Sequence, residues 1–495
     1  MNYISTRGQG GFVSASKAIM QGISADGGLF IPESIPAFEK DALNKLLKMS
    51  YKEKAKYVLS MYLSDFTEEE INSCVENAYR VAAFGSENSA PLYPLGDSRN
   101  ILELWHGPTC AFKDMALQIL PHLLTTSLRK NNEKRTAVIL VATSGDTGKA
   151  ALEGFCDVDG TKIMVFYPNN GVSKIQQKQM TTQSGNNVNV CAIEGNFDDA
   201  QSGVKAIFAD KAVAKELDEK GYFLSSANSI NWGRLVPQIV YYVHAYCEMV
   251  NAGKVNLGEK INITVPTGNF GNILAAYYAY RMGLPVNKFI CASNANKVLT
   301  DFINTGVYDK RRQFYTTDSP SMDILISSNL ERMLYYLTDG TDRVAELMSK
   351  LSKEGMYTLS GEETEKLQAI FACGCCDDEK TAEEISALKK EYGYTVDTHT
   401  AVAMSVYREY LAKTGDNTPC VIASTASPFK FAASVITGLG DKIEEDEFEN
   451  LTKLACLSGL ECPEQLATLK AKEERFTCVC EKEDMQAMLY KFLNM

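Results

Sequence analysis

Lys113 lies where a lysine can take part in covalent chemistry. It follows the apolar pair Ala111 and Phe112, and a stretch typical of a helix follows it at 115–120. Burial and the positive end of a helix both disfavour an ammonium ion, so they lower the pKa of a lysine. A neutral lysine can form a Schiff base with a carbonyl compound. The alternative is a lysine whose ammonium group extends into solvent, and the residue on its own favours that interpretation.

The segment Pro266–Asn272 could bind a phosphate. It follows an apolar run at 261–265, precedes an apolar helix from Ile273, and contains Gly268 and Gly271. Two glycines let the backbone approach an anion closely, and the N–H groups that open a helix attract negative charge. The segment matches neither the P-loop nor the G-x-G-x-x-G pattern. An ordinary turn between a strand and a helix is the alternative.

Two further loops place hydroxyl and acidic groups after apolar runs. The turn at 143–148 follows the run 138–142, and the loop at 424–428 follows the run 420–423. Such groups can hold a carboxylate or a ring hydroxyl. They can equally cap the helix that follows, and each loop considered alone favours capping.

The segment 226–234 suits a second phosphate. Asn228, Ser229 and Arg234 stand before a helical stretch, and an arginine offers a planar fork of donors to an anion. The alternative is a helix cap next to a surface arginine. Two separate phosphate sites would be unexpected in a protein that has no use for phosphate.

These loops require a framework of parallel strands. Short apolar runs alternate with helical stretches, which predicts parallel sheets with helices on both faces. In such folds ligands bind at the carboxyl ends of the strands, where helices begin. The predicted strands are 137–142, 162–167, 188–193, 261–265, 289–292 and 420–423, and the predicted helices include 41–62, 200–217 and 235–249.

The chain divides into three predicted zones. Residues 1–95 have helical periodicity and end at a proline-rich break, and residues 96–440 contain the alternating strands and helices. Residues 441–495 open with an acidic cluster and are expected to form a solvated helical segment.

The composition and charge of the chain limit which classes of partner and which cellular compartment are expected. The formal net charge is -12, which makes nucleic acid and membrane surfaces poor partners but leaves room for a small anionic substrate. The N-terminus has no signal-peptide pattern and no apolar run is long enough to cross a bilayer. The 14 cysteines show no disulfide spacing, so reduced thiols in the cytoplasm are expected. Cys373 and Cys376 have a C-x-x-C spacing, but no second pair completes a zinc site, and we expect no metal.

Taken together, these segments resemble the threonine synthase family of fold-type II pyridoxal-phosphate (PLP) enzymes, relatives of tryptophan synthase β. The opening stretches 3–8 and 22–32 are similar to the start of that family. The segments 106–109 with 112–114, 143–148, 226–231, 268–272 and Thr425 occur in the family's order. The resemblance covers most of residues 1–440. It implies two open, mostly parallel sheets flanked by helices, a helical N-terminal domain, and a monomer or homodimer.

The resemblance also implies roles for single residues. Lys113 would carry the cofactor, Asp146 would lie near the ring hydroxyl of the cofactor, and Thr425 would face its pyridine nitrogen. The cofactor phosphate would be held by Gly268, Asn269, Phe270, Gly271 and Asn272. The substrate carboxylate would be placed by Ser144 and Thr147, and the substrate phosphate by Lys174, Asn228, Ser229 and Arg234. One departure is Asn169-Asn170, where relatives often carry an arginine, so a possible positive charge for the phosphate is absent at this place.

The implied reaction converts O-phosphohomoserine and water into threonine and phosphate. Two alternatives stay open at this point. A phospho-lyase of the threonine-synthase-like type would use the same residues and release a 2-oxo acid, ammonia and phosphate. A binding protein without catalytic activity is the other, although the presence of Lys113, 268–272 and Thr425 argues against it. His399, which precedes a helical stretch, could also line the cleft.

Overall fold

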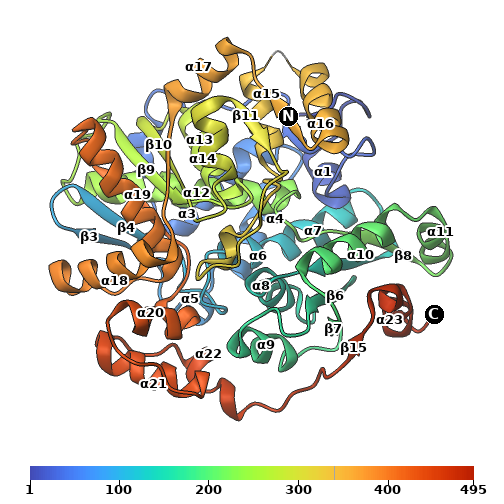
Figure 1. Cartoon of the computed structure of the whole chain (residues 1–495). Helices are drawn as coiled ribbons and strands as arrows, with labels where there is room; N and C mark the ends of the chain where they lie inside the picture. The colour runs from blue at the N-terminus through green and yellow to red at the C-terminus, as the bar shows by residue number, and fades with distance from the viewer. Residues whose placement is uncertain (339) are drawn as a thin grey trace.

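The computed structural model describes residues 1–338 and 340–495. The chain folds around two open sheets of mostly parallel strands, with helices on both faces of each sheet (Figure 1). This arrangement confirms the α/β fold that the alternating pattern predicted. Within the described residues, no helix is long and apolar enough to span a membrane.

The larger sheet has six strands in the order β13-β10-β9-β14-β4-β3. All neighbours are parallel except β3 and β4, which form an antiparallel hairpin. The strand β14 lies at its centre, where Ile422 pairs with Thr264 on one side and Ile101 on the other. The strands are β3 (Leu92–Leu95), β4 (Arg99–Glu103), β9 (Ile261–Pro266), β10 (Val286–Ser293), β13 (Phe371–Cys375) and β14 (Cys420–Ser424).

The smaller sheet has five parallel strands in the order β15-β7-β6-β5-β8. Its central strands are apolar runs that are buried on both sides, as expected for a parallel sheet covered by helices. The strands are β5 (Thr136–Ala142), β6 (Thr161–Pro168), β7 (Val188–Ile193), β8 (Tyr222–Ser225) and β15 (Val479–Cys480). The six strands predicted from apolar runs are all present in the two sheets.

The helices of the first half of the chain cover the smaller sheet and build the N-terminal region. They are α1 (Ala15–Gln21), α2 (Ala42–Leu46), α3 (Tyr51–Tyr62), α4 (Glu68–Ala78), α5 (Val81–Phe84), α6 (Asp114–Leu117), α7 (Leu120–Lys130), α8 (Asp146–Phe155), α9 (Lys174–Thr181), α10 (Phe197–Ala209) and α11 (Lys211–Glu219). Two short pairs of strands complete the fold: β1 (Tyr3–Ser5) with β2 (Phe30–Pro32), and β11 (Val307–Asp309) with β12 (Met356–Thr358).

Most helices of the second half lie on the side of the larger sheet, and the last one packs against the smaller sheet near the C-terminus. The helices of this half are α12 (Trp232–Asn251), α13 (Gly271–Met282), α14 (Val298–Thr305), α15 (Leu330–Leu337), α16 (Thr341–Glu354), α17 (Gly361–Ile370), α18 (Asp378–Tyr392), α19 (Thr398–Thr414), α20 (Ala432–Gly438), α21 (Glu447–Ser458), α22 (Glu464–Ala467) and α23 (Met485–Leu493). Short 3-10 turns include η1 (Pro320–Met322), η2 (Pro428–Phe431), η3 (Leu469–Ala471) and η4 (Lys482–Asp484). Helix α12 is buried along nearly its whole length and packs on α3 and α13.

Two predicted helices differ from the structure in detail, and the predicted domain boundary falls at a strand hairpin. The helix expected at 200–217 is two helices, because Asp210 caps α11 with its side chain and ends α10. The helix expected at 41–62 is also interrupted, and Ser50 starts α3 with a capping box. The predicted boundary at residue 95 falls inside the β3–β4 hairpin, and the N-terminal helices share a hydrophobic core with both sheets. The division into 1–95, 96–440 and 441–495 therefore stays a prediction.

The C-terminal segment is more than a solvated helix, as a correction to the expectation for 441–495. It runs along the lower edge of the molecule in Figure 1 and adds β15 beside β7. Its apolar side chains Leu454 and Leu466 are buried against one core, and Leu489 against another. The segment thus ties the two halves of the molecule together.

Candidate active site

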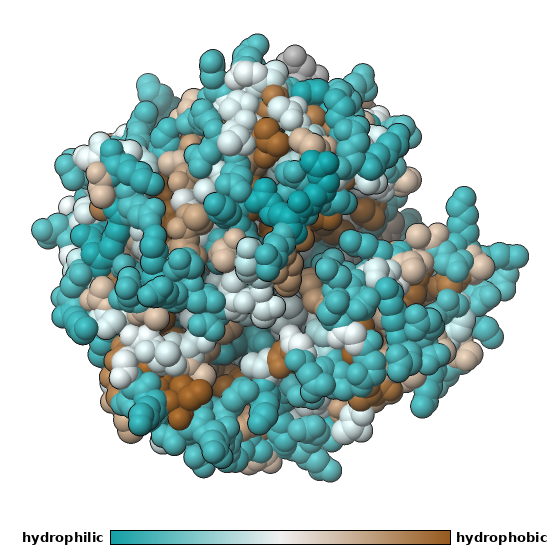
Figure 2. Space-filling view, viewed as in Figure 1, coloured by the Kyte–Doolittle hydropathy of each residue, from teal (hydrophilic) through white to brown (hydrophobic). Residues whose placement is uncertain are grey.

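A cleft of about 290 Å³ collects loops that follow strands of both sheets. It is lined by the ends of β5, β9 and β14 and by the first residues of α8, α12 and α13. Figure 2 shows that this face of the molecule is mostly hydrophilic and is hollowed near its centre. The carboxyl ends of parallel strands are where ligands bind in such folds, so the cleft is the candidate site.

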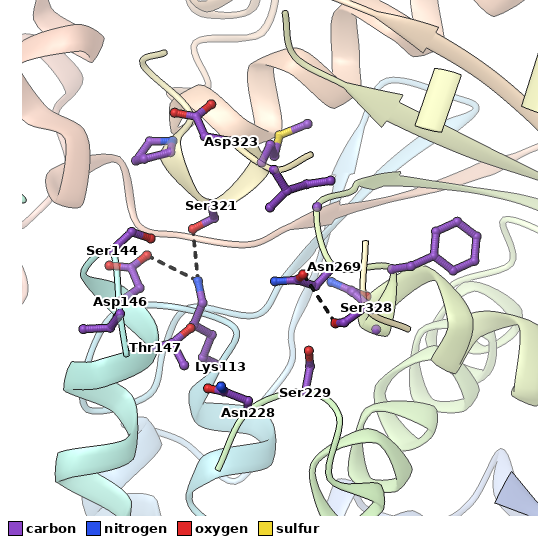
Figure 3. A pocket seen from close by; sticks show the side chains of 18 of the residues that line it. Lys113, Ser144, Asp146, Thr147, Asn228, Ser229, Asn269, Ser321, Asp323 and Ser328 are labelled. Carbon is purple, nitrogen blue, oxygen red and sulfur yellow. Dashed lines mark hydrogen bonds and ion pairs between the residues drawn. The ribbon is translucent and has the colours of Figure 1, made fainter. Parts of the chain in front are cut away.

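Lys113 extends into the cleft from the start of α6. Its residue is 8% exposed, and its Nζ atom donates to Ser321 Oγ at 3.1 Å and lies 3.6 Å from Asp146 Oδ2 (Figure 3). Burial is the main reason that its pKa is lowered, and the charges of Arg234 and Lys430 act in the same direction, whereas Asp146 raises it. A lysine that loses its proton readily and faces a cleft is suited to covalent catalysis.

Asp146 stands at the first turn of α8, where the positive end of the helix favours a carboxylate. Gln176 donates to its Oδ1 atom at 2.9 Å, and Lys430 lies 3.0 Å from the same atom. Burial alone would raise the pKa of Asp146, but Lys430 and Lys113 hold it well below its usual range. Gly145 makes this approach possible, because its φ is 131° and a Cβ atom there would lie 2.5 Å from Gln176.

The segment Gly268–Asn272 passes close to a neighbouring loop and opens α13. A Cβ atom on Gly268 would lie 2.4 Å from the Ser321 carbonyl oxygen, so the backbone comes nearer than a side chain would allow. Phe270 has a φ of 62°, a strained conformation of the kind found at ligand sites. No side chain caps α13, and its first N–H groups are therefore directed at the cleft without a side-chain acceptor.

Asn272 adds a free donor to that helix start. Its Oδ1 atom accepts hydrogen bonds from the hydroxyls of Tyr241, at 2.9 Å, and Tyr242. These two bonds fix the orientation of the amide and turn its Nδ2 atom away from the tyrosines. That nitrogen is buried and has no hydrogen-bond partner among the residues that the structure describes. An unsatisfied buried donor at the positive end of a helix indicates a place for an anion.

Arg234 lies in the same cleft, on the first turn of α12. It is 5% exposed, and one of its nitrogens donates to the Ala227 carbonyl oxygen at 2.8 Å. No carboxylate of the described residues forms an ion pair with it, and burial lowers the pKa of Arg234 to about 10. Asn228 and Ser229, both half-buried, line the cleft beside it. A buried guanidinium without an acidic partner is suited to an anionic ligand.

The remaining predicted residues also line the cleft. Ser144 and Thr147, at the start of α8, are half-buried, and Thr425 follows β14. The Thr425 carbonyl oxygen accepts the Phe112 N–H at 2.8 Å, which fixes the backbone next to Lys113. The structure therefore brings the side chains of three separate strand ends to one place.

Three protein-family models match this chain. They are described as the N terminus of threonine synthase, matched at residues 2–79, a pyridoxal-phosphate dependent enzyme, matched at 102–425, and the C-terminal part of threonine synthase, matched at 400–489. Over 437 residues the chain is 39% identical to a threonine synthase of Pseudomonas aeruginosa, covering 88% of this chain and 90% of that one. The chain belongs to the threonine synthase family.

Solved structures of threonine synthases have the same fold. A PLP-bound threonine synthase from Brucella melitensis superposes with a TM-score of 0.88 at 35% identity and covers all of both chains. The yeast enzyme gives the same TM-score at 33% identity, with 100% and 99% coverage. The human protein named threonine synthase-like 1 is 40% identical over 441 residues, 87% of this chain. This chain spans only 58% of the length of that human protein.

The cleft fits the family's cofactor. PLP carries a phosphate and an aldehyde, and the cleft offers an uncapped helix start with the free Asn272 nitrogen for the first and Lys113 for the second. The close backbone approach at Gly268 leaves the space a side chain would fill. These features agree with the family's dependence on PLP.

One predicted residue lies elsewhere. Lys174 is exposed on the outer side of the molecule, where it lines a separate surface hollow with Glu445 and Lys470. The reason is local: Ser173 caps α9, and Gln176 rather than Lys174 is on the side that faces Asp146. We therefore do not include Lys174 among the residues proposed to hold the substrate.

Three residues of the site or its surroundings were not predicted to have a role there. Ser321 contacts Lys113, and Gln176 and Lys430 contact Asp146. His399, which the sequence offered as a residue that could line the cleft, does line it. Its Nε2 atom accepts the Ser321 N–H at 3.2 Å, and its Nδ1 atom lies 2.8 Å from Asp397. Among the three unpredicted residues, a sequence signal existed for Lys430, which stands two residues after the hydroxyl loop at 424–428.

Proposed function

We propose that this protein is an active threonine synthase, which converts O-phospho-L-homoserine and water into L-threonine and inorganic phosphate with PLP as cofactor. The observation that carries the proposal is the pairing of groups in one cleft. A buried lysine there faces two separate sets of donors, one at the start of α13 and one around Arg234. A cofactor phosphate and a substrate phosphate would occupy them.

Each set of residues has a proposed role in binding. Lys113 would bind the cofactor covalently, and Gly268, Asn269, Phe270, Gly271 and Asn272 would hold its phosphate. Asp146 would lie near the ring hydroxyl and Thr425 near the pyridine nitrogen. Ser144 and Thr147 would place the substrate carboxylate, and Asn228, Ser229 and Arg234 the substrate phosphate. When bound, PLP supplies an electron sink that stabilises negative charge on the substrate carbon atoms next to the reacting amine.

The protein's own contribution to the chemistry is to move protons. Lys113 Nζ, once free of the cofactor, would remove the proton from the substrate Cα atom and pass it on, and the amine, neutral again, would then remove one proton from Cβ. Arg234 would hold the phosphate as it leaves Cγ, since a guanidinium stabilises the charge that develops on the departing oxygen. Lys113 would then return the Cβ proton at Cγ, and water adds its hydroxyl group at Cβ while a proton returns to Cα. The neutral hydroxyl of Thr425 would not force a proton onto the ring nitrogen, as a carboxylate would.

The reaction is tested by mixing purified, PLP-loaded protein with O-phosphohomoserine and identifying the products by mass spectrometry. We expect threonine and phosphate in equal amounts. Lys113→Ala, loaded in the same way, should form neither. Phosphate with a 2-oxo acid and ammonia, but no threonine, would replace the proposal by the phospho-lyase activity. Absence of any product from the parent protein would reject both.

The setting of the enzyme is also a proposal. All 14 cysteines are free thiols in the structure, which supports a reducing compartment such as the cytoplasm. We propose that the protein works as a monomer or homodimer. Size-exclusion chromatography with light scattering would test the latter.

A further inference from the structure

Lys430 is a fully buried lysine next to the cleft, with no role in the function proposed above. It stands on η2, just after β14, and its side chain is 0% exposed. Its Nζ atom lies 3.0 Å from Asp146 Oδ1 and donates to Gln179 Oε1 on α9. Lys430 does not belong to the described residues that line the cleft, so it contacts the site only through Asp146.

Asp146 stands between two lysines. One of its oxygens lies 3.6 Å from Lys113 Nζ and the other 3.0 Å from Lys430 Nζ (Figure 3 shows the first contact). Gln176 donates to the oxygen on the Lys430 side, and Gln179 holds the lysine itself. Both oxygens of the carboxylate are thus oriented, one toward each lysine.

The charges of Lys113, Asp146 and Lys430 balance only when Lys113 is neutral. Asp146 carries one negative charge, and Lys430 supplies one positive charge that solvent cannot reach. If Lys430 were absent, a buried carboxylate would draw its compensation from Lys113 and favour a protonated amine there. With Lys430 present, the carboxylate is already paired, and the amine of Lys113 is free to lose its proton.

We propose that Lys430 is a positioning residue for the reaction, which pairs with Asp146 from behind and thereby keeps the amine of Lys113 available as a neutral base. The inference rests on the proposed function, because it assumes that Lys113 is the lysine that carries the cofactor. Its physical content is a shared carboxylate. Lys430 acts on Lys113 through Asp146 and touches neither the cofactor nor the substrate.

Lys113 has further neighbours besides Asp146 and Lys430. Lys113 is influenced by Arg234 from α12 as well as by Asp146 and Lys430, and Ser321 is its hydroxyl neighbour. Burial lowers the pKa of Lys113 most, and both cations lower it further.

Lys430 also influences Asp114, whose pKa burial raises to about 7, and the thiol of Cys110, whose pKa burial raises to about 12. Asp114 is satisfied by Thr109, which donates to it through its N–H and its hydroxyl. Neither group lies between Lys430 and Lys113 in the way that Asp146 does.

The first experiment compares three variants of the full chain, each loaded with PLP. Lys430→Met removes the charge and keeps the length of the side chain, and Lys430→Arg keeps the charge. Lys54→Met is the matched control, because Lys54 is 1% exposed and its ion-pair partner is Glu248, outside the cleft. The visible absorption band of the PLP-loaded protein is recorded across a range of pH. The readout is the midpoint of this titration, which is the pH at which the band has changed halfway. The melting temperature is recorded alongside.

Lys430→Met should raise the midpoint of the band titration by about one pH unit, because Asp146 would then be left without Lys430 and would act on Lys113 alone, and a neighbouring opposite charge shifts a pKa by about 1–3 units. Lys430→Arg and Lys54→Met should leave the midpoint unchanged, although both could lower the melting temperature. A second readout uses the full chain after PLP is removed. In Lys430→Met the rate of Lys113 acetylation at neutral pH, followed by peptide mass spectrometry, should fall about tenfold.

The outcomes separate the inference from the proposed function. An unchanged midpoint and acetylation rate in Lys430→Met would overturn the inference, because Lys430 would then only join α9 to the larger sheet. A parent protein with no visible band would instead contradict the role of Lys113. Should Lys430→Met fail to fold, Asp146→Asn/Lys430→Met removes both charges of the pair. Its midpoint should match the parent within about half a unit, and a fall of a full unit would show that Lys430 has no influence on Lys113.

Discussion

The two sides of the cleft deal with charge in opposite ways. On the side of α8 the carboxylate of Asp146 has two lysines and an amide within reach. On the side of α12 and α13, among the described residues, Arg234 has no acidic partner and the Asn272 nitrogen has no hydrogen-bond partner. On the side of α8 the charged groups find their partners within the protein. On the side of α12 and α13 the donors are satisfied only when anions bind.

This difference separates the work of the two sides. Buried donors without acceptors destabilise a protein, so they persist where a ligand supplies the acceptor. The side of α12 and α13 is therefore suited to hold phosphates. A fully paired carboxylate attracts no anion, and the side of α8 is suited to control the proton of Lys113. Four changes test this contrast.

Asp146→Asn should have the largest effect on stability, because it leaves Lys430 buried without its counter-charge. Removing one partner of a buried pair typically lowers the free energy of unfolding by about 3–5 kcal/mol. Since folding lowers the pKa of Asp146 below its ordinary value of 3.8, this stabilisation is complete above that pH and is lost as the pH falls below it. Urea unfolding at pH 7 and at low pH should show a gap between variant and parent that closes on acidification. Exposed Asp159→Asn should show no gap, and equal stability of parent and Asp146→Asn at pH 7 would contradict the account.

Arg234→Met should raise the KM for O-phosphohomoserine by about 100-fold, the effect of losing charge-assisted hydrogen bonds. Without anions its stability should match or exceed that of the parent, because a buried unpaired charge is removed. Arg332 is the matched control: it is fully buried, but its donors contact the carbonyl oxygens of Phe30, Ser229 and Ile230. Arg332→Met should therefore unfold more easily. Steady-state kinetics and thermal unfolding measure both effects, and an unchanged KM in Arg234→Met would break the contrast.

Asn272→Leu should weaken PLP binding by about tenfold, since it removes one donor to the cofactor phosphate. A fluorescence titration of the cofactor-free protein with PLP gives the dissociation constant. Asn450→Leu, at a buried asparagine of the C-terminal segment, should lower stability without changing that constant. Equal affinities in parent and Asn272→Leu would place the cofactor phosphate elsewhere.

Lys174→Met should have the smallest effect, less than about twofold on either kinetic constant, because an exposed charge outside the cleft is screened by solvent. The same assays as for Arg234→Met apply. A large rise in KM would restore the role that the sequence suggested for this lysine.

The sequence reveals the framework and the parts of the site that follow strands. Long apolar runs such as 137–142 predict strands because burial on both faces leaves no alternation. Short strands escape this test: β8 has four residues, and β13 contains a glycine between two cysteines. The loops of the site were identified because they directly follow these apolar runs.

Contacts made across the fold could not be read in this way. Ser321 reaches Lys113 from a loop more than 200 residues along the chain, and Gln176 reaches Asp146 from a helix. Lys174 and Gln176 differ by only two positions, yet the rotation of α9 sends one to solvent and the other to the site. Proximity along the chain therefore could not tell which of these two residues faces the site.

The central claim is that Lys113, and no other buried lysine, carries the cofactor. Reducing the PLP-loaded protein with borohydride makes the bond to the cofactor permanent, and peptide mass spectrometry then locates it. The account predicts a single modified peptide, which contains Lys113. Modification of Lys430 or Lys54 instead, or of no lysine at all, would contradict it.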